Sequence, residues 1–98
     1  MKHSVEHPLE PARARDLLDR ALATYREHYA ENSVETSWID ERTAAVDFEV
    51  TGRRVAGCIT VCDDCYDIDL RLPWMLRPFK RRIAESFETE LQRWIARA

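Results

Sequence analysis

The spacing of apolar residues changes twice along this chain, and the changes define the order of its structural elements. Between about Pro11 and Ala30, apolar side chains recur every three to four residues, as on one face of an amphipathic helix. Over residues 34–72 the spacing is two, which is typical of strands with one buried face. After Pro73 the helical spacing returns and runs to the end of the sequence. The pattern therefore predicts a helix, a group of strands and a second helix.

Four strands are expected between the helices, and a short extended segment at residues 2–9 precedes the first helix. The expected strands cover residues 34–40, 46–50, 55–61 and 66–72. Their connections are short, which favours antiparallel neighbours in a meander. The buried side of the first of these strands stays open, because Trp38 and Ile39 are adjacent and point to opposite faces. We expect an α+β two-layer sandwich in the order β-α-β-β-β-β-α, with an antiparallel sheet and two helices on one face.

Length and charge limit the class of protein. A chain of 98 residues fits one domain, so we expect a single α+β domain over residues 1–98. The net charge of -3 is too balanced to indicate binding to nucleic acid or to an anionic membrane. No apolar run is long enough to span a bilayer, and residues 1–9 lack the apolar core of a secretory signal. We therefore expect a cytoplasmic protein.

The sequence offers no grouping of residues that is typical of catalysis or of a nucleotide cofactor. Two glycines are too few for a Gly-rich phosphate loop, and no serine is joined to a histidine by a known motif. Asp47 and Asp67 are expected on the solvated face of the sheet, about 10 Å apart on strands that flank a central one. We expect a protein that is not an enzyme and has no cofactor. A small hydrolase or isomerase is an alternative that would need a pocket between helix and sheet.

Three cysteines fall within eight positions, at Cys58, Cys62 and Cys65. The spacing CxxxCxxC is that of radical SAM enzymes, but here the cysteines lie on a strand and its turn, in a chain too short for the required barrel. A zinc site would need a fourth ligand, and the histidines are distant in sequence. A reversible Cys62–Cys65 disulfide is a further alternative, as are three thiols without a role. A metal- or redox-responsive protein using these cysteines is thus the alternative function.

The strongest functional signal is a cluster of positive charge where the last strand joins the final helix. Five cations occur within twelve residues that contain no acid: Arg71, Arg77, Lys80, Arg81 and Arg82. Positive charge at a helix N-terminus is unfavourable by about 0.3–1 kcal/mol for each residue. This cost indicates a use, such as binding an anion or an acidic partner. In the structural alternative, Arg81 pairs with Glu85 and Lys80 lies along the rim of the apolar face.

Aromatic residues share this segment with the cations. Trp74 and Phe79 interleave with them, and any part left exposed would form an apolar docking patch. Together these residues form what we call the basic-aromatic corner: Arg71, Trp74, Arg77, Phe79, Lys80, Arg81 and Arg82. The sequence predicts that this corner binds a partner or an anion.

Residues 72–80, LPWMLRPFK, resemble the LPxxLRPFK-like segment of the bacterial polyhydroxyalkanoic acid system family. A short strand with histidines at residues 3–7, the long Ala/Arg/Leu helix and the Glu-rich final helix are similar as well. The resemblance implies a small cytoplasmic protein associated with storage-polyester granules, whose partner is a granule-associated protein or the polyester surface. It supplies no catalytic residue. The cysteines and Arg81, where the family pattern has a small residue, depart from it, so neither is implied as a family property.

The final helix has a wide apolar arc that includes Trp94 and Ile95 near its end. Exposing two such large side chains to water would be unfavourable. We therefore expect a homodimer.

Overall fold

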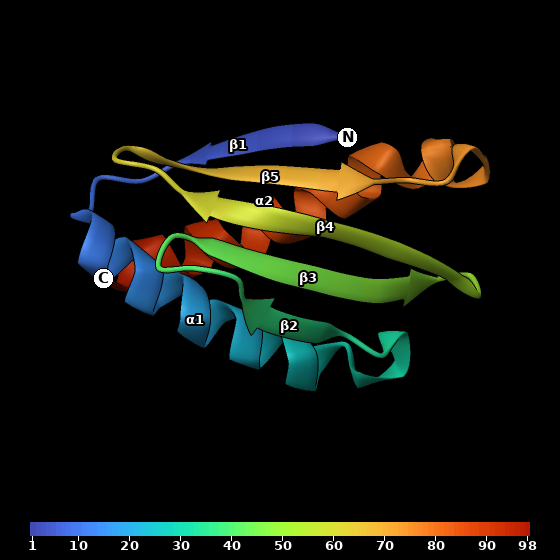
Figure 1. The fold of residues 1–98 in the computed structure, drawn as a ribbon, viewed down its shortest axis with the longest axis horizontal. Coiled ribbons are helices and arrows are strands. Elements are labelled where there is room, and N and C mark those ends of the chain that lie inside the picture. The colour runs from blue at the N-terminus through green and yellow to red at the C-terminus, as the bar shows by residue number, and fades with distance from the viewer.

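The computed structural model describes residues 1–98 and contains a five-stranded antiparallel sheet with both helices on one face (Figure 1). The strands are β1 (Lys2–Glu6), β2 (Glu35–Trp38), β3 (Thr43–Val50), β4 (Arg53–Val61) and β5 (Cys65–Arg71). The helices are α1 (Pro11–His28) and α2 (Lys80–Arg97), with short 3₁₀ helices η1 (Ala30–Asn32) and η2 (Trp74–Phe79). The predicted α+β fold and its element order are confirmed.

The strand order in the sheet is β1-β5-β4-β3-β2. β2 to β5 form the expected meander, and β1 pairs with β5 at the far edge, with His3 opposite Ile68. Because β1 and β2 lie at opposite edges, α1 must cross behind the sheet to connect them (Figure 1). The strand that begins the chain therefore lies beside the strand that leads into η2 and α2.

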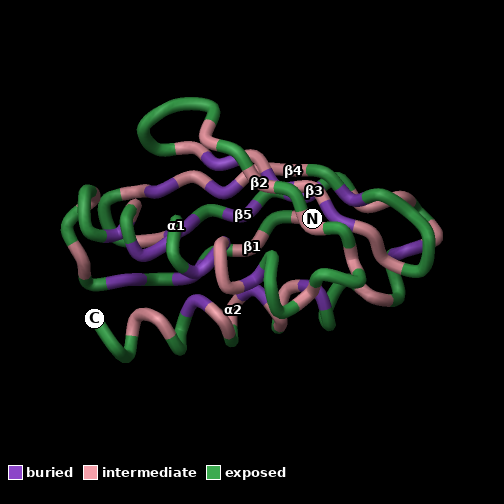
Figure 2. The backbone as a smooth tube through the Cα atoms, turned by 90° about the horizontal axis from the view of Figure 1, so that it is seen from below, coloured by how far each residue is buried: buried purple, intermediate pink, exposed green.

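The core lies between the sheet and the two helices. Buried positions alternate with more exposed ones along the strands, as the tube in Figure 2 shows, and Val46 and Phe48 of β3 are typical of the buried set. Phe87 of α2 stacks on Tyr25 of α1 with ring centres 5.1 Å apart, and it contacts Phe48 at 5.9 Å. These rings join both helices to the sheet. Neither helix combines the length and the apolar character that crossing a membrane requires.

The structure also settles the orientation of β2. Trp38 faces α1, and the Arg15 guanidinium lies 4.1 Å from the centre of the Trp38 ring. The Nε1–H of Trp38 donates to Asp19 Oδ1 at 2.9 Å. Ile39 follows the end of the strand and is 66% exposed. β2 is shorter than the alternation predicts because the chain turns at this point.

The second helix begins later than the apolar spacing predicts. The segment after the last strand is the 3₁₀ helix η2, and α2 starts only at Lys80. The physical reason is Pro78, which has no N–H to donate and whose ring would clash with the carbonyl four residues earlier in an α-helix. Lys80, Arg81 and Arg82 therefore take the first three positions of α2.

Gly57 in β4 allows β5 to approach closely, and this gives a test of the sheet packing. A Cβ at this position would lie 2.1 Å from the Asp69 carbonyl oxygen and 2.7 Å from the Leu70 Cα. Because both contacts are with backbone, we expect Gly57→Ala to lower the free energy of unfolding by about 3 kcal/mol or more, measured by urea denaturation. The control is Gly52→Ala, at a turn with open space and a φ of +77°, which should cost about 1–2 kcal/mol. The reverse ranking would contradict the packing described.

Candidate functional site

The basic-aromatic corner lies where β5, η2 and α2 meet, at the orange turns on the right of Figure 1. Leu76 is 1% exposed and anchors η2 in the core, and its N–H donates to the Pro73 carbonyl at 2.9 Å. With Leu76 directed inward, Trp74 and Arg77 of the same short helix are exposed. Buried Leu76 and half-buried Phe79 thus hold a segment in which Trp74 and Arg77 face solvent.

The five cations of the corner have no acidic partner within the molecule. All of them are exposed, and none takes part in the six ion pairs of the structure. The structural alternative, in which Arg81 pairs with Glu85, is wrong: no such pair forms. Lys80 is exposed and forms no ion pair, whereas Ile83 and Phe87 of the same helix are buried. The positive charge of this corner is left unpaired.

The N-terminus of α2 adds to this positive potential. Its first turn contains no acidic residue, and Phe79 at the N-cap position makes no side-chain hydrogen bond to the helix. The first turn of a helix carries the positive end of the helix dipole. Lys80, Arg81 and Arg82 therefore lie in the position on the helix where positive charge is least favourable.

The two aromatic residues of the corner differ in exposure. Trp74 is 76% exposed, and with Ile39 it forms the pair of large hydrophobic side chains that the fold leaves in solvent. Phe79 is half-buried and packs against the core. Phe79 therefore fixes the corner to the fold, whereas the indole of Trp74 is free to contact a partner.

An apolar groove of about 430 Å³ adjoins the corner at Phe79 and Arg82. It lies between α1, the end of β3 and the first turns of α2, and no carboxylate or histidine lines it. Tyr25 and Ser86 line this groove, and the buried Tyr25 hydroxyl is hydrogen-bonded to Ser86 Oγ at 2.8 Å. Burial raises the pKa of Tyr25 to about 12, although the Ser86 hydrogen bond opposes this. His28, at the end of α1, is exposed and lies outside the groove.

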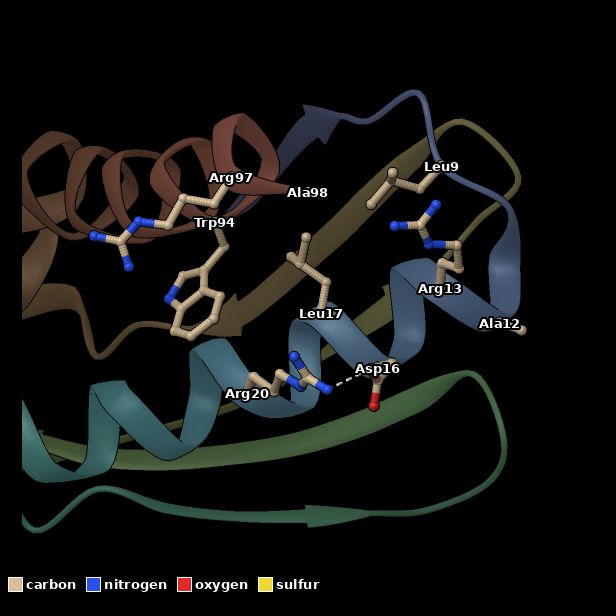
Figure 3. Close-up of a pocket in the computed structure, with 9 residues that line it drawn as sticks. All are labelled: Leu9, Ala12, Arg13, Asp16, Leu17, Arg20, Trp94, Arg97 and Ala98. Atoms are coloured by element: carbon tan, nitrogen blue, oxygen red, sulfur yellow. Dashed lines mark ion pairs between the residues drawn. The ribbon is translucent and has the colours of Figure 1, made fainter.

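A second groove, of about 570 Å³, lies between α1 and the opposite end of α2 (Figure 3). Three arginines line it: Arg20 pairs with Asp16 at 3.4 Å, the Arg97 guanidinium lies 5.8 Å from the centre of the Trp94 ring, and Arg13 forms no ion pair. This groove therefore carries a paired carboxylate among its arginines, whereas no cation of the basic-aromatic corner forms an ion pair. Trp94 and Ile95 are half-buried against the core, which weakens the reason for a homodimer, and the dimer stays a prediction.

The structure brings together two of the three cysteines. The Cys62 thiol donates to Asp67 Oδ2 at 3.3 Å and the Cys65 thiol to Asp67 Oδ1 at 3.6 Å, whereas Cys58 lies outside this group. All three are free thiols. Desolvation, followed by the hydrogen bond with Asp67, raises the pKa of Cys62 to about 12, so this thiol is protonated at neutral pH. The sequence prediction missed Asp67, although alternation along β5 places it on the same face as Cys65.

His7 is a second residue whose role the sequence prediction missed. It is 5% exposed, and its Nδ1 accepts the Leu9 N–H at 3.1 Å, so the hydrogen on Nε2 donates to the Cys62 carbonyl at 3.0 Å. The backbone N–H of His7 also donates to the Asp64 carbonyl at 2.9 Å. The end of β1 thus fixes the β4–β5 turn that carries the two cysteines.

Reversing two charges at the start of α2 tests whether the cations are unpaired. We expect Lys80→Glu and Arg81→Glu to stabilise the fold by about 0.3–1 kcal/mol each, because acidic residues are favourable at a helix N-terminus. Thermal denaturation at low salt measures the change, which should shrink as salt screens it. The control is Arg97→Glu at the other end of α2, where the same change should be destabilising. If the first two variants are less stable than wild type, the cations have partners inside the fold.

Comparison with known protein families assigns the chain as a whole. The family model described as "Putative polyhydroxyalkanoic acid system protein" matches residues 2–95 of the 98 residues. No curated protein and no solved structure matches the chain. The match spans the sheet, both helices and the basic-aromatic corner, so it does not rest on the LPWMLRPFK segment alone. The chain therefore belongs to the polyhydroxyalkanoic acid system protein family.

Proposed function

We propose that this protein is a non-enzymatic, cytoplasmic accessory protein that binds an acidic partner at the polyhydroxyalkanoate granule surface through its basic-aromatic corner. Family membership supports the link to the polyester system. The observation that carries the binding role is the set of five exposed cations, none of them in an ion pair, around an indole that is 76% exposed. Exposed charge beside an exposed aromatic ring is typical of surfaces that bind other proteins.

The chemistry of the corner favours a protein partner over the polyester itself. A polyester chain is built of uncharged esters, so its surface offers apolar contact for Trp74 but few counter-charges for the cations. An acidic protein surface with an apolar centre matches both parts of the corner. The preferred partner is therefore an acidic granule-associated protein, and direct adsorption to the polyester is the competing outcome.

The cost of the corner to the free protein supports the same proposal. Cations at the first three positions of α2 are unfavourable by about 0.3–1 kcal/mol each while no anion is present. A bound carboxylate would reverse the sign of this term, because it would meet the cationic side chains at the positive end of the α2 dipole. Binding of an acidic partner would thus offset the unfavourable interaction of the three cations with the α2 dipole. Because this attraction is electrostatic, binding would weaken as salt rises above about 0.15 M.

The non-enzymatic part of the proposal rests on what surrounds the corner. No carboxylate or histidine lines the adjoining groove, and the hydroxyl of Tyr25 within it is held protonated by burial. General acid–base catalysis needs a group that exchanges a proton near neutral pH. The corner itself offers permanent positive charge and apolar surface, which suit binding.

A triple charge reversal tests the proposal. We expect Arg77→Glu, Lys80→Glu and Arg81→Glu together to abolish co-sedimentation of the protein with granules from polyester-accumulating cells. The expected stabilisation of α2 by Glu at positions 80 and 81 separates loss of binding from loss of folding. Granules stripped of their proteins distinguish the two partners, because they should not retain even the wild-type protein.

The matched control changes the same amount of charge elsewhere. Arg13, Arg53 and Arg97 are exposed and form no ion pair, and two of them line the groove of Figure 3. Their replacement by Glu should leave granule binding intact. Retention of the corner variant at the wild-type level, or equal loss of binding by the control, would show that the corner is not the binding surface.

A further inference from the structure

The turn between β4 and β5 gathers three side chains that can hold a metal ion. Cys62 and Cys65 flank the two-residue turn, and Asp67 lies two residues further along β5. Their ligand atoms all lie within 4.8 Å of one another. In a tetrahedral zinc site, bonds of about 2.3 Å to sulfur and about 2.1 Å to oxygen place two ligand atoms about 3.5 Å apart. The Cys62 sulfur lies 3.3 Å from Asp67 Oδ2 and the Cys65 sulfur lies 3.6 Å from Asp67 Oδ1, so each sulfur is close to this distance from one carboxylate oxygen.

We propose that Cys62, Cys65 and Asp67 form a zinc-binding site with one position open to water. Two thiolates and one carboxylate favour zinc over magnesium or calcium, which prefer ligand sets made of oxygen. Cys65 and Asp67 alternate with the buried Tyr66 and Ile68 of β5 and so lie on the opposite face of the strand, where an ion reaches them from solvent without a change in the fold. This site is separate from the basic-aromatic corner, and its existence does not depend on the proposed function.

The hydrogen bonds of the metal-free protein show how the ion would enter. The Asp67 carboxylate accepts one thiol hydrogen on each of its oxygens, so two protons occupy the space where a cation would lie. On binding, each thiol releases its proton to solvent and its sulfur becomes a thiolate ligand of the ion. The three negative ligands then exceed the charge of Zn²⁺ by one.

The backbone around the ligands is fixed before any ion binds. The Cys62 N–H donates to the Cys65 carbonyl at 2.8 Å, and the Cys62 carbonyl in turn accepts from His7 at 3.0 Å. These bonds hold the two cysteines on the same turn, so little ordering of the chain is needed when the metal arrives. A preformed ligand set binds more tightly than a mobile one.

Zinc titration with site-resolved alkylation tests this site, using the full chain kept reduced by a phosphine. One equivalent of Zn²⁺ should bind and should protect Cys62 and Cys65 from iodoacetamide, while Cys58 continues to react. Cys58 supplies the matched control, because Cys58→Ser should bind zinc as the wild type does. Circular dichroism checks that each variant is folded.

The variants of the ligands themselves complete the test. Cys62→Ser and Cys65→Ser should each abolish stoichiometric zinc binding. Loss of a residue that only supports a metal ligand lowers metal affinity about tenfold or more, so Asp67→Asn, which changes a ligand itself, should lower zinc affinity at least about tenfold. The proposal is wrong if no stoichiometric zinc binds, if zinc protects all three thiols equally, or if Asp67→Asn binds with unchanged affinity.

Discussion

The position of Pro78 determines the chemistry of the basic-aromatic corner. Without an N–H to donate, this proline confines residues 74–79 to a 3₁₀ helix and delays the start of α2 to Lys80. Buried Leu76 fixes the 3₁₀ segment against the core, so the exposed residues beside it have a defined direction. The result is a first helical turn made of three cations, preceded by an exposed indole. A helix that began at Trp74 would instead have placed those cations in its middle, away from its free N–H groups.

The five cations of the basic-aromatic corner form no ion pair although the protein contains many acidic residues. The chain has 18 acidic and 15 basic residues. Outside the corner, four arginines form ion pairs with carboxylates; for example, Arg54 lies 2.7 Å from Asp47 and 3.6 Å from Glu49, and Arg42 lies 3.4 Å from Asp63. Residues 71–82 contain no acid, so the corner keeps its positive charge for solvent or for a partner. This separation of charge, more than the net charge of the chain, is the basis of the proposed binding role.

Much of this architecture could be predicted from the sequence, because a period of two along residues 46–72 leaves a strand little choice of face. The start of α2 could not, since Leu76 and Phe79 are three residues apart and fit a 3₁₀ helix as well as an α-helix. The side of β2 that Trp38 occupies could not be predicted from the alternation, because it is defined by the contacts of Trp38 with Arg15 and Asp19 of α1. For the proposed metal ligands, spacing along the chain pointed to Cys58 and not to Asp67, because spacing does not show which side chains meet across a turn.

The most direct test of the account is photo-crosslinking from the two exposed hydrophobic positions. A photoreactive amino acid placed at Trp74 or at Ile39 samples the corner and a distant turn of similar exposure, 76% and 66%. In polyester-accumulating cells, the account predicts a crosslink from position 74 to an acidic granule-associated protein, lost when Lys80 and Arg81 are reversed to Glu, and no such product from position 39. Equal products from both positions, or a product from position 39 alone, would contradict it.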